Sequence, residues 1–123
     1  MSVPCTRHLQ ALLLTLLLVP YPVYGLVDRI AQRERVRSLF YHSYNNYMAH
    51  AFPYDELRPL TCDGVDSWGS HAVTLIDSLD MLAVLGDHAE LARGISLLEE
   101  SVSFSKDFNV SLFESTIRTV GGL

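Results

Sequence analysis

Three acidic residues and one arginine carry the residue types that sugar chemistry uses. Glu114 and Arg118 lie four residues apart, so an α-helix would bring them onto one face. Asp77 and Asp80 lie three residues apart in an earlier segment. Glycoside hydrolysis needs two carboxyl groups, one to protonate the leaving oxygen and one to act on the opposite face of the sugar. These residues are therefore the candidates for acid–base chemistry.

Spacing alone also allows a plainer interpretation of both pairs. A Glu–Arg pair four residues apart on a helix surface is common and contributes only about 0.2–0.5 kcal/mol. Asp77 and Asp80 can instead cap loops or pair with arginines, because burying an unpaired charge is costly. Residue types and spacing favour these structural roles and leave the catalytic roles open.

Four helices are predicted to position these residues. Apolar residues recur at three- and four-residue spacing over 27–51, 88–103 and 110–120, as in amphipathic helices. Segment 71–85 is apolar over most of a helical circumference and is expected to be buried. Segment 53–70, with its prolines and glycines, is predicted to be a loop. The predicted fold class is all-α, built from helical hairpins of a larger, incomplete helical array.

Several single residues mark the expected boundaries of these helices. Gly86 is predicted to follow the end of helix 71–85, and Asp87 to cap helix 88–103. Asn109 is predicted to cap helix 110–120. Trp68, the only tryptophan, is expected to pack in the core, although a sugar-stacking role stays open.

Residues 1–25 have the pattern of a secretory signal peptide. Arg7 gives a basic start, an apolar run follows over 9–19, and Val23 and Gly25 supply small residues before a cleavage point. The apolar run is shorter than the roughly 20 residues that a membrane span needs. An uncleaved anchor or a buried helix is the alternative. We expect domain 1–25 to be removed and domain 26–123 to form the folded part.

Composition excludes some classes of partner and cofactor. The whole sequence has 9 basic and 14 acidic residues and a net charge of −5. Glu34 interrupts its one basic run, so nucleic acid is not expected as a partner. The histidines are scattered, and no His or Cys spacing typical of a transition-metal site occurs. We therefore predict no metal ligands within this sequence.

Cys62 and Asn109 are candidates for chemistry specific to the secretory pathway. Cys62 is the only cysteine outside the predicted leader, so it is either free or paired with a cysteine elsewhere. Asn109-Val110-Ser111 is an acceptor sequence for N-glycosylation, which is either used or silent.

Four segments together resemble glycoside hydrolase family 47, the class I alpha-mannosidases. They occur in the family's order and spacing across nearly the whole of 26–123. Segments 51–53 and 60–64 are most similar to the family's ER degradation-enhancing alpha-mannosidase-like group. The four segments are FYHSYNNY at 40–47, DELRP at 55–59, TLIDSLD at 74–80 and FESTIR at 113–118, the last continuing to Gly122.

The resemblance implies a fold, an activity and roles for particular residues. It implies an (α/α)7 barrel, of which this sequence supplies the opening helices, and an inverting hydrolysis of terminal α1,2-linked mannose. Glu114 matches the family's first active-site acid, a proposed general acid, and Arg118 a substrate-contacting arginine. Asp77 and Asp80 match acids whose role is less direct. A calcium ion is implied as cofactor, with its ligand beyond Leu123.

The resemblance also implies a cellular setting. The expected partners are high-mannose N-glycans on misfolded glycoproteins in the endoplasmic reticulum lumen, whose trimming feeds degradation. Cys62 could further pair with an ER oxidoreductase. Non-catalytic binding of misfolded glycoproteins or glycans is the alternative function. Because the family's remaining acids are expected beyond Leu123, the 123-residue chain alone is expected to be inactive.

Overall fold

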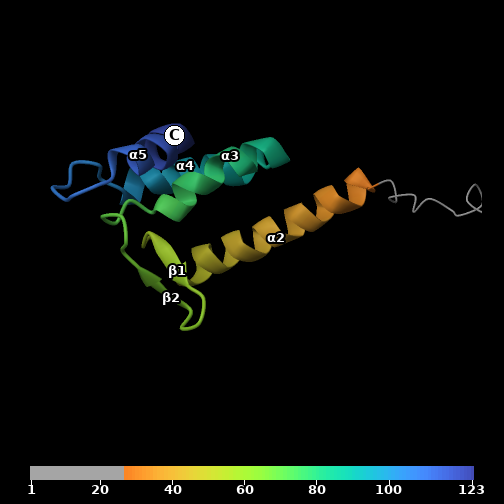
Figure 1. Ribbon diagram of the computed structural model, residues 1–123, viewed down its shortest axis with the longest axis horizontal. Coiled ribbons are helices and arrows are strands. Elements are labelled where there is room, and N and C mark those ends of the chain that lie inside the picture. Colours follow the sequence, from red (N-terminus) through yellow and green to blue (C-terminus); the bar gives the residue numbers. More distant parts are fainter. Residues whose placement is uncertain (1–26) are drawn as a thin grey trace, which may run out of the picture. The chain divides into compact units, whose positions relative to one another are not determined.

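The computed structural model describes residues 27–123, so the predicted leader 1–25 lies outside the described residues. Helices dominate this part of the chain and one small β-hairpin interrupts them (Figure 1). The elements are α2 (Arg29–His50), β1 (Glu56–Arg58), β2 (Asp63–Val65), α3 (Val73–Leu85), α4 (His88–Ser101), α5 (Leu112–Glu114) and η1 (Ser115–Val120). The predicted all-α class is confirmed.

None of the helices within 27–123 is both long and apolar enough to cross a membrane.

The chain divides into two compact units at Arg33 and Glu34. The described part of the first unit is the beginning of α2, where the Asp28 carboxylate accepts backbone N–H bonds from Ile30 and Ala31 at 3.0 and 3.1 Å. This carboxylate caps the helix by satisfying otherwise unpaired amides. The second unit, residues 34–123, contains all the candidate site residues.

Helix α2 packs through the C-terminal half of its predicted apolar stripe. Tyr44 and Tyr47 are buried there, whereas Val36 and Leu39 of the same stripe are exposed. The Tyr44 hydroxyl donates to the Glu90 carboxylate of α4 at 2.7 Å. Burial and this carboxylate together raise the pKa of Tyr44. Helix α2 is thus held to α4 by a polar contact beside the apolar core.

Segment 53–70, predicted to be a loop, contains the antiparallel hairpin β1–β2. Glu56 pairs with Val65, and Arg58 with Asp63, in its register. The Arg58 guanidinium donates to the Asp63 carboxylate at 3.0 and 2.5 Å. Hydrogen bonds from Thr61 and then Arg58 lower the pKa of Asp63. Strands of three residues are too short to give an alternating pattern, which is why the sequence did not reveal them.

Helices α3 and α4 form the predicted antiparallel hairpin and lie side by side (Figure 1). Gly86 ends α3 with φ +74°, a conformation that favours glycine, and its N–H bonds back to Ala83. The Asp87 side chain caps α4 by accepting from the Glu90 amide at 3.2 Å. Both boundary predictions are confirmed. One face of α3 is buried, comprising Val73, Leu75, Ile76, Ser78, Leu79 and Leu82.

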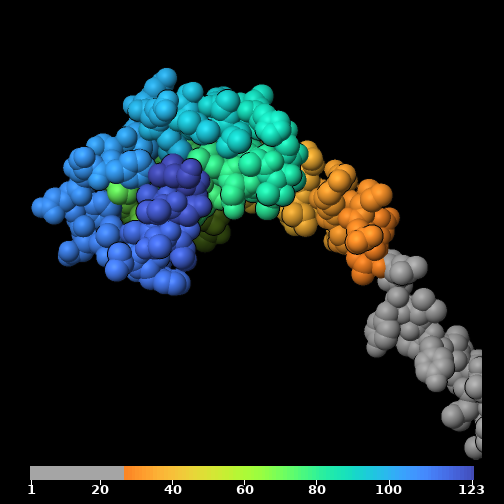
Figure 2. All heavy atoms as spheres, turned by 90° about the horizontal axis from the view of Figure 1, so that it is seen from above, coloured from red at the N-terminus to blue at the C-terminus, as the bar shows by residue number. Residues whose placement is uncertain are grey.

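The predicted helix 110–120 is present but differs in two respects. Its cap is Ser111 and not Asn109, because the Ser111 hydroxyl accepts from the Glu114 amide at 3.4 Å. After one α-helical turn the backbone widens into the π-helical turn η1. This turn packs against α3, as Figure 2 shows for the dark blue C-terminal residues.

Candidate functional site

Arg118 is the centre of the candidate site. It projects from η1 and donates through Nε and Nη2 to Oδ2 of Asp77 on α3, at 2.8 and 2.7 Å. Its Nη1 lies 3.8 Å from Oε2 of Glu114. The Asp77 hydrogen bond raises the pKa of Arg118, with smaller contributions from Glu56 and Glu114. The arginine therefore bridges two helices and keeps its charge.

Glu114 lies at the junction of α5 and η1 and contacts Arg118 loosely. Its Oε2 lies farther from the Arg118 guanidinium than Oδ2 of Asp77 does, at 3.8 Å against 2.8 and 2.7 Å. The Glu114 side chain is 45 % exposed, which leaves its carboxylate accessible.

Asp77 and Asp80 separate in the structure. Both lie on the exposed face of α3, although this helix was expected to be buried over most of its circumference. Asp77 joins Glu114 through Arg118, in agreement with the interpretation that it pairs with an arginine. Asp80 lines a different, largely apolar groove of about 590 Å³, together with Glu99 and Leu123. The structure therefore brings together Glu114, Arg118 and Asp77, but not Asp80.

Asp55 is the functional group that sequence reasoning missed. It lies in the segment predicted to be a loop, yet its side chain is fully buried at 0 % exposure. Its carboxylate accepts backbone N–H bonds from Trp68, Ser70 and His71 at 2.6, 2.9 and 2.7 Å. A fourth amide, from Val73, lies 3.4 Å away at the start of α3. Only its place in the family-like segment 55–59 distinguished it in the sequence.

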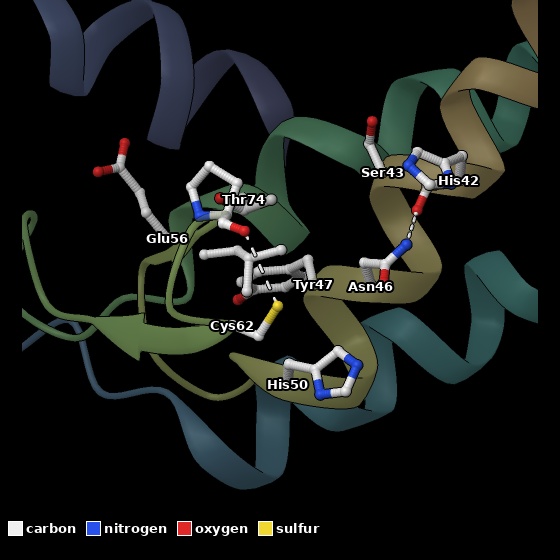
Figure 3. A pocket seen from close by; sticks show the side chains of 10 residues that line it. His42, Ser43, Asn46, Tyr47, His50, Glu56, Cys62 and Thr74 are labelled. Atoms are coloured by element: carbon white, nitrogen blue, oxygen red, sulfur yellow. Dashed lines mark hydrogen bonds between the residues drawn. The ribbon is translucent and has the colours of Figure 1, made fainter.

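A second groove, of about 630 Å³, lies between α2 and the hairpin (Figure 3). His42, Asn46 and His50 line it from α2, and Cys62 faces them from the hairpin turn. Cys62 is exposed and free, with its Sγ 3.8 Å from the Pro59 carbonyl. The groove contains none of the predicted catalytic residues.

Trp68 and Asn109 are the remaining candidates named from the sequence. Trp68 is half-buried, and its indole N–H has no hydrogen-bond partner among the described residues. Asn109 is exposed. Across residues 27–123, no three His, Cys, Asp or Glu side chains lie close enough together to hold a metal ion.

Comparison with known proteins identifies what this chain is similar to. A model of the family described as Glycosyl hydrolase family 47 matches residues 39–123. The ER degradation-enhancing alpha-mannosidase-like protein 2 of Mus musculus is 57 % identical over 96 residues, covering 78 % of this chain and 17 % of the relative. The Homo sapiens protein of the same name is 53 % identical over 104 residues, covering 85 % and 18 %.

A relative from a plant extends the likeness to a protein named for its substrate. The mannosyl-oligosaccharide 1,2-alpha-mannosidase MNS1 of Arabidopsis thaliana is 39 % identical over 92 residues, covering 75 % of this chain and 16 % of the relative. This chain therefore spans less than a fifth of the length of each of these three relatives.

Helical architecture and sequence similarity together define the class as that of the all-α glycosidases. The chain belongs to glycosyl hydrolase family 47. The expectation drawn from the four sequence segments is thereby confirmed at the level of the family. These relatives' names further associate this branch of the family with degradation in the ER.

Proposed function

We propose that the protein carrying this chain hydrolyses terminal α1,2-linked mannose from high-mannose N-glycans in the ER, with inversion at the anomeric carbon. The observation that carries this proposal is the family match over residues 39–123, which includes Glu114, Arg118 and Asp77. Names of relatives that specify mannosyl-oligosaccharide and ER degradation support the substrate and the compartment.

Glu114 is the general acid in this proposal. Its carboxyl group would protonate the leaving glycosidic oxygen while a second carboxylate activates water on the other face of the sugar. Glu114 lies near the beginning of a helix, where its backbone N–H donates to the capping Ser111 hydroxyl, and its accessible side chain suits contact with a substrate. No residue of 27–123 is assigned as the second carboxylate.

Arg118 is the proposed substrate-binding residue, and Asp77 orients it. A guanidinium has five N–H donors in a fixed plane. Asp77 engages Nε and Nη2, which leaves the Nη1 edge for Glu114 and for a sugar hydroxyl. Asp77 is thus a positioning residue, whereas Asp80 has no part in this arrangement. Calcium enters the proposal through the family alone, and none of the described residues is assigned to it.

Replacing Glu114 by glutamine tests the proposal in the protein at its full expressed length. Loss of a positioned general acid is expected to lower kcat for mannose release by roughly 10²- to 10⁴-fold, with little change in KM. Glu100→Gln, a change of the same type at an exposed position on α4, serves as the control. Mannose release by Glu114→Gln at the unaltered rate would remove Glu114 from the mechanism.

A second candidate function is binding of misfolded glycoproteins or glycans without cleavage. The free, exposed thiol of Cys62 favours it, because such a thiol is available for a mixed disulfide with an ER oxidoreductase. Glu114→Gln separates the two functions, since a binding protein would still promote degradation of its clients. Cys62→Ser would abolish a disulfide-linked complex on a non-reducing gel.

Entry into the secretory pathway completes the proposal. Residues 1–25 would direct the chain there and be removed, so the mature N-terminus would be Leu26. The exposed Asn109 would then be open to glycosylation. Treatment with an endoglycosidase should lower the apparent mass of the wild-type protein by one glycan more than that of Asn109→Gln.

A further inference from the structure

The loop before α3 holds its shape around the buried Asp55 carboxylate. Ser70 and Ala72 have φ of +58° and +52°, which non-glycine residues rarely adopt, and Gly69 has +76°. The amides of residues on either side of them donate to Asp55. With these amides fixed inward, the Gly69 and Ser70 carbonyls are free to accept hydrogen bonds from another segment.

Segment 102–110, which joins α4 to α5, supplies the partner of those carbonyls. The Lys106 ammonium donates to the carbonyl oxygens of Gly69 and Ser70, both at 3.0 Å. Lys106 is the only lysine of the sequence. The segment contains no helix or strand beyond the end of α4, so side-chain contacts of this kind must fix its path.

Two aromatic rings strengthen the same contact. Phe104 and Phe108 lie against the buried His71 imidazole, and the centroid of each phenyl ring is 5.1 Å from the centroid of the imidazole. Phe108 also covers Gly69 so closely that a Cβ atom added there would lie 2.2 Å from its ring. Figure 2 shows the blue segment 102–110 against the green loop that precedes α3. Any side chain larger than hydrogen at position 69 would displace Phe108.

This contact lies close in sequence to Glu114. Three residues after Phe108, Ser111 caps the helix in which Glu114 is the third residue. Within the described part of the chain, the polar contact of the Glu114 side chain is the 3.8 Å approach to Arg118. The start of α5, and with it the carboxyl group, is therefore placed by the segment that leads into it together with the packing of η1 on α3.

We propose that Lys106 and Phe108, docked on the loop of Gly69 and His71, form a latch that positions Glu114 for reaction. Lys106 and Phe108 act through the backbone and are positioning residues, not catalytic ones. The inference rests on the proposed function of Glu114 for its effect on rate, but the placement of α5 can be measured without any activity.

The test uses Lys106→Met, which keeps most of the side-chain length but loses the ammonium. Lys106→Arg retains the charge and the capacity to donate to two carbonyls, and Asp107→Asn is a control for altered charge on the same segment. All are made in the protein at its full expressed length. Hydrogen exchange of the amides of 112–116 is measured with mannose release and with the thermal midpoint of unfolding.

If the latch positions Glu114, Lys106→Met should speed exchange at 112–116 by about tenfold, because two hydrogen bonds to a charged group are lost. It should lower kcat by roughly 10- to 100-fold with less than about a twofold change in KM, as displaced catalytic groups do. Lys106→Arg should restore both quantities to near the wild-type values, and Asp107→Asn should alter neither.

Unchanged exchange at 112–116 in Lys106→Met would overturn the latch. Faster exchange with unchanged kcat would also overturn it, because the segment would then move without affecting Glu114. If the wild-type protein releases no mannose, the proposed function fails, and exchange in Lys106→Met and Lys106→Arg still decides whether the latch places α5.

Discussion

The buried Asp55 holds the surrounding loop together through hydrogen bonds. A buried carboxylate must be compensated by hydrogen bonds, and here backbone amides from one loop provide them. Its backbone carbonyl also accepts from the Thr74 amide and hydroxyl, at 3.1 and 2.6 Å. One residue thus fixes both the loop and the first turn of α3.

Asp55→Asn is expected to destabilise the protein by about 2–3 kcal/mol. Asparagine keeps one oxygen acceptor, but its NH₂ group would face amides that also donate, and the charge that strengthens these bonds is lost. The measurement is the urea midpoint of unfolding at constant slope. Asp66→Asn, at an exposed position of the same loop, is the control, and a loss below about 0.5 kcal/mol would contradict the assigned role.

At the scale of elements, the sequence predicted the helices and two of their boundaries well. Apolar spacing located all four helices, and Gly86 and Asp87 were recognised because their turn and cap chemistry is local. The hairpin β1–β2, the π-helical turn and the Ser111 cap were missed. The strands are too short to show alternation, and the π-helical turn adds a backbone position that a periodic pattern does not record. The Ser111 cap is local, and Ser111 with Glu114 three residues later has the spacing of a capping box, which the preference for Asn109 overlooked.

The candidate site was likewise predicted only in part from the sequence. Sequence resemblance singled out Glu114, Arg118, Asp77 and Asp80, and the structure brings the first three together but not Asp80. Helical spacing predicted the Glu114–Arg118 pair, whereas the close partner of Arg118 is Asp77, forty-one residues away. A pairing of that separation depends on how η1 packs against α3, which no local pattern specifies.

Two adjacent glycines at the end of the chain test how η1 and the residues after it pack against α3. A Cβ added to Gly122 would lie 2.8 Å from a methyl group of Ile76 and 3.0 Å from its carbonyl oxygen. Gly122→Ala is therefore expected to cost about 1–3 kcal/mol of stability through overpacking against a backbone that cannot move aside. Chemical denaturation followed by circular dichroism measures the change.

Gly121 is the matched control, since its added Cβ would meet only the Thr116 carbonyl at 3.4 Å and its φ of −78° suits alanine. Gly121→Ala should leave stability unchanged or raise it by up to about 1 kcal/mol, because alanine restricts the unfolded chain. Equal effects of the two alanines would mean that Gly122 does not pack closely on α3.

The α4 cap gives a second prediction at this scale. Asp87 accepts both the Glu90 amide and the Tyr41 hydroxyl, the latter at 2.6 Å, so it joins α4 to α2 as well as starting α4. Asp87→Ala should cost about 1–2 kcal/mol, whereas Asp87→Ser, which keeps a capping oxygen, should cost less. Thermal unfolding of both variants checks this order, and a larger loss for Ser than for Ala would refute the capping role.

At the scale of the whole molecule, apolar side chains are distributed unevenly. Leu112, Phe113 and Val120 are 82, 70 and 72 % exposed, although all three belong to the apolar stripe predicted for helix 110–120. Large exposed apolar patches favour association or further packing. The 123-residue chain studied by itself is therefore expected to bind a hydrophobic dye.

Serine substitution at Leu112 and Phe113 together should reduce that dye fluorescence clearly, because both side chains contribute exposed apolar surface. Val84→Ser is the comparison, since Val84 is 81 % exposed but belongs to α3 and not to this segment. Dye binding that falls as much for Val84→Ser as for the double variant would show that the signal does not come from the C-terminal segment.

Stability should also fall on acidification, in two separate stages. Burial lowers the pKa of His71 below its ordinary value of 6.5, and nearby Lys106 lowers it further while Asp55 opposes the shift. The unfolded chain then binds a proton more readily than the folded chain. Stability is therefore full above pH 6.5 and declines as the pH falls from there towards the folded pKa.

The second stage comes from carboxylates. The hydrogen bond from Tyr41 lowers the pKa of Asp87, and that from Arg93 lowers the pKa of Glu90. Their contribution is present above the ordinary values of 3.8 and 4.5 and is lost as the pH falls through the lower folded values. The free energy of unfolding, measured in urea from pH 7.5 to 3, should decline first through His71 and then through these groups.

His71→Gln separates the stages because glutamine does not titrate. Its stability between about pH 7 and 5 should depend less on pH than that of the wild type, while the decline below about pH 4.5 should remain. His50→Gln, at an exposed position of α2, is the control and should keep the wild-type slope in both ranges. An unchanged slope for His71→Gln between pH 7 and 5 would show that protonation of this buried imidazole does not govern acid stability.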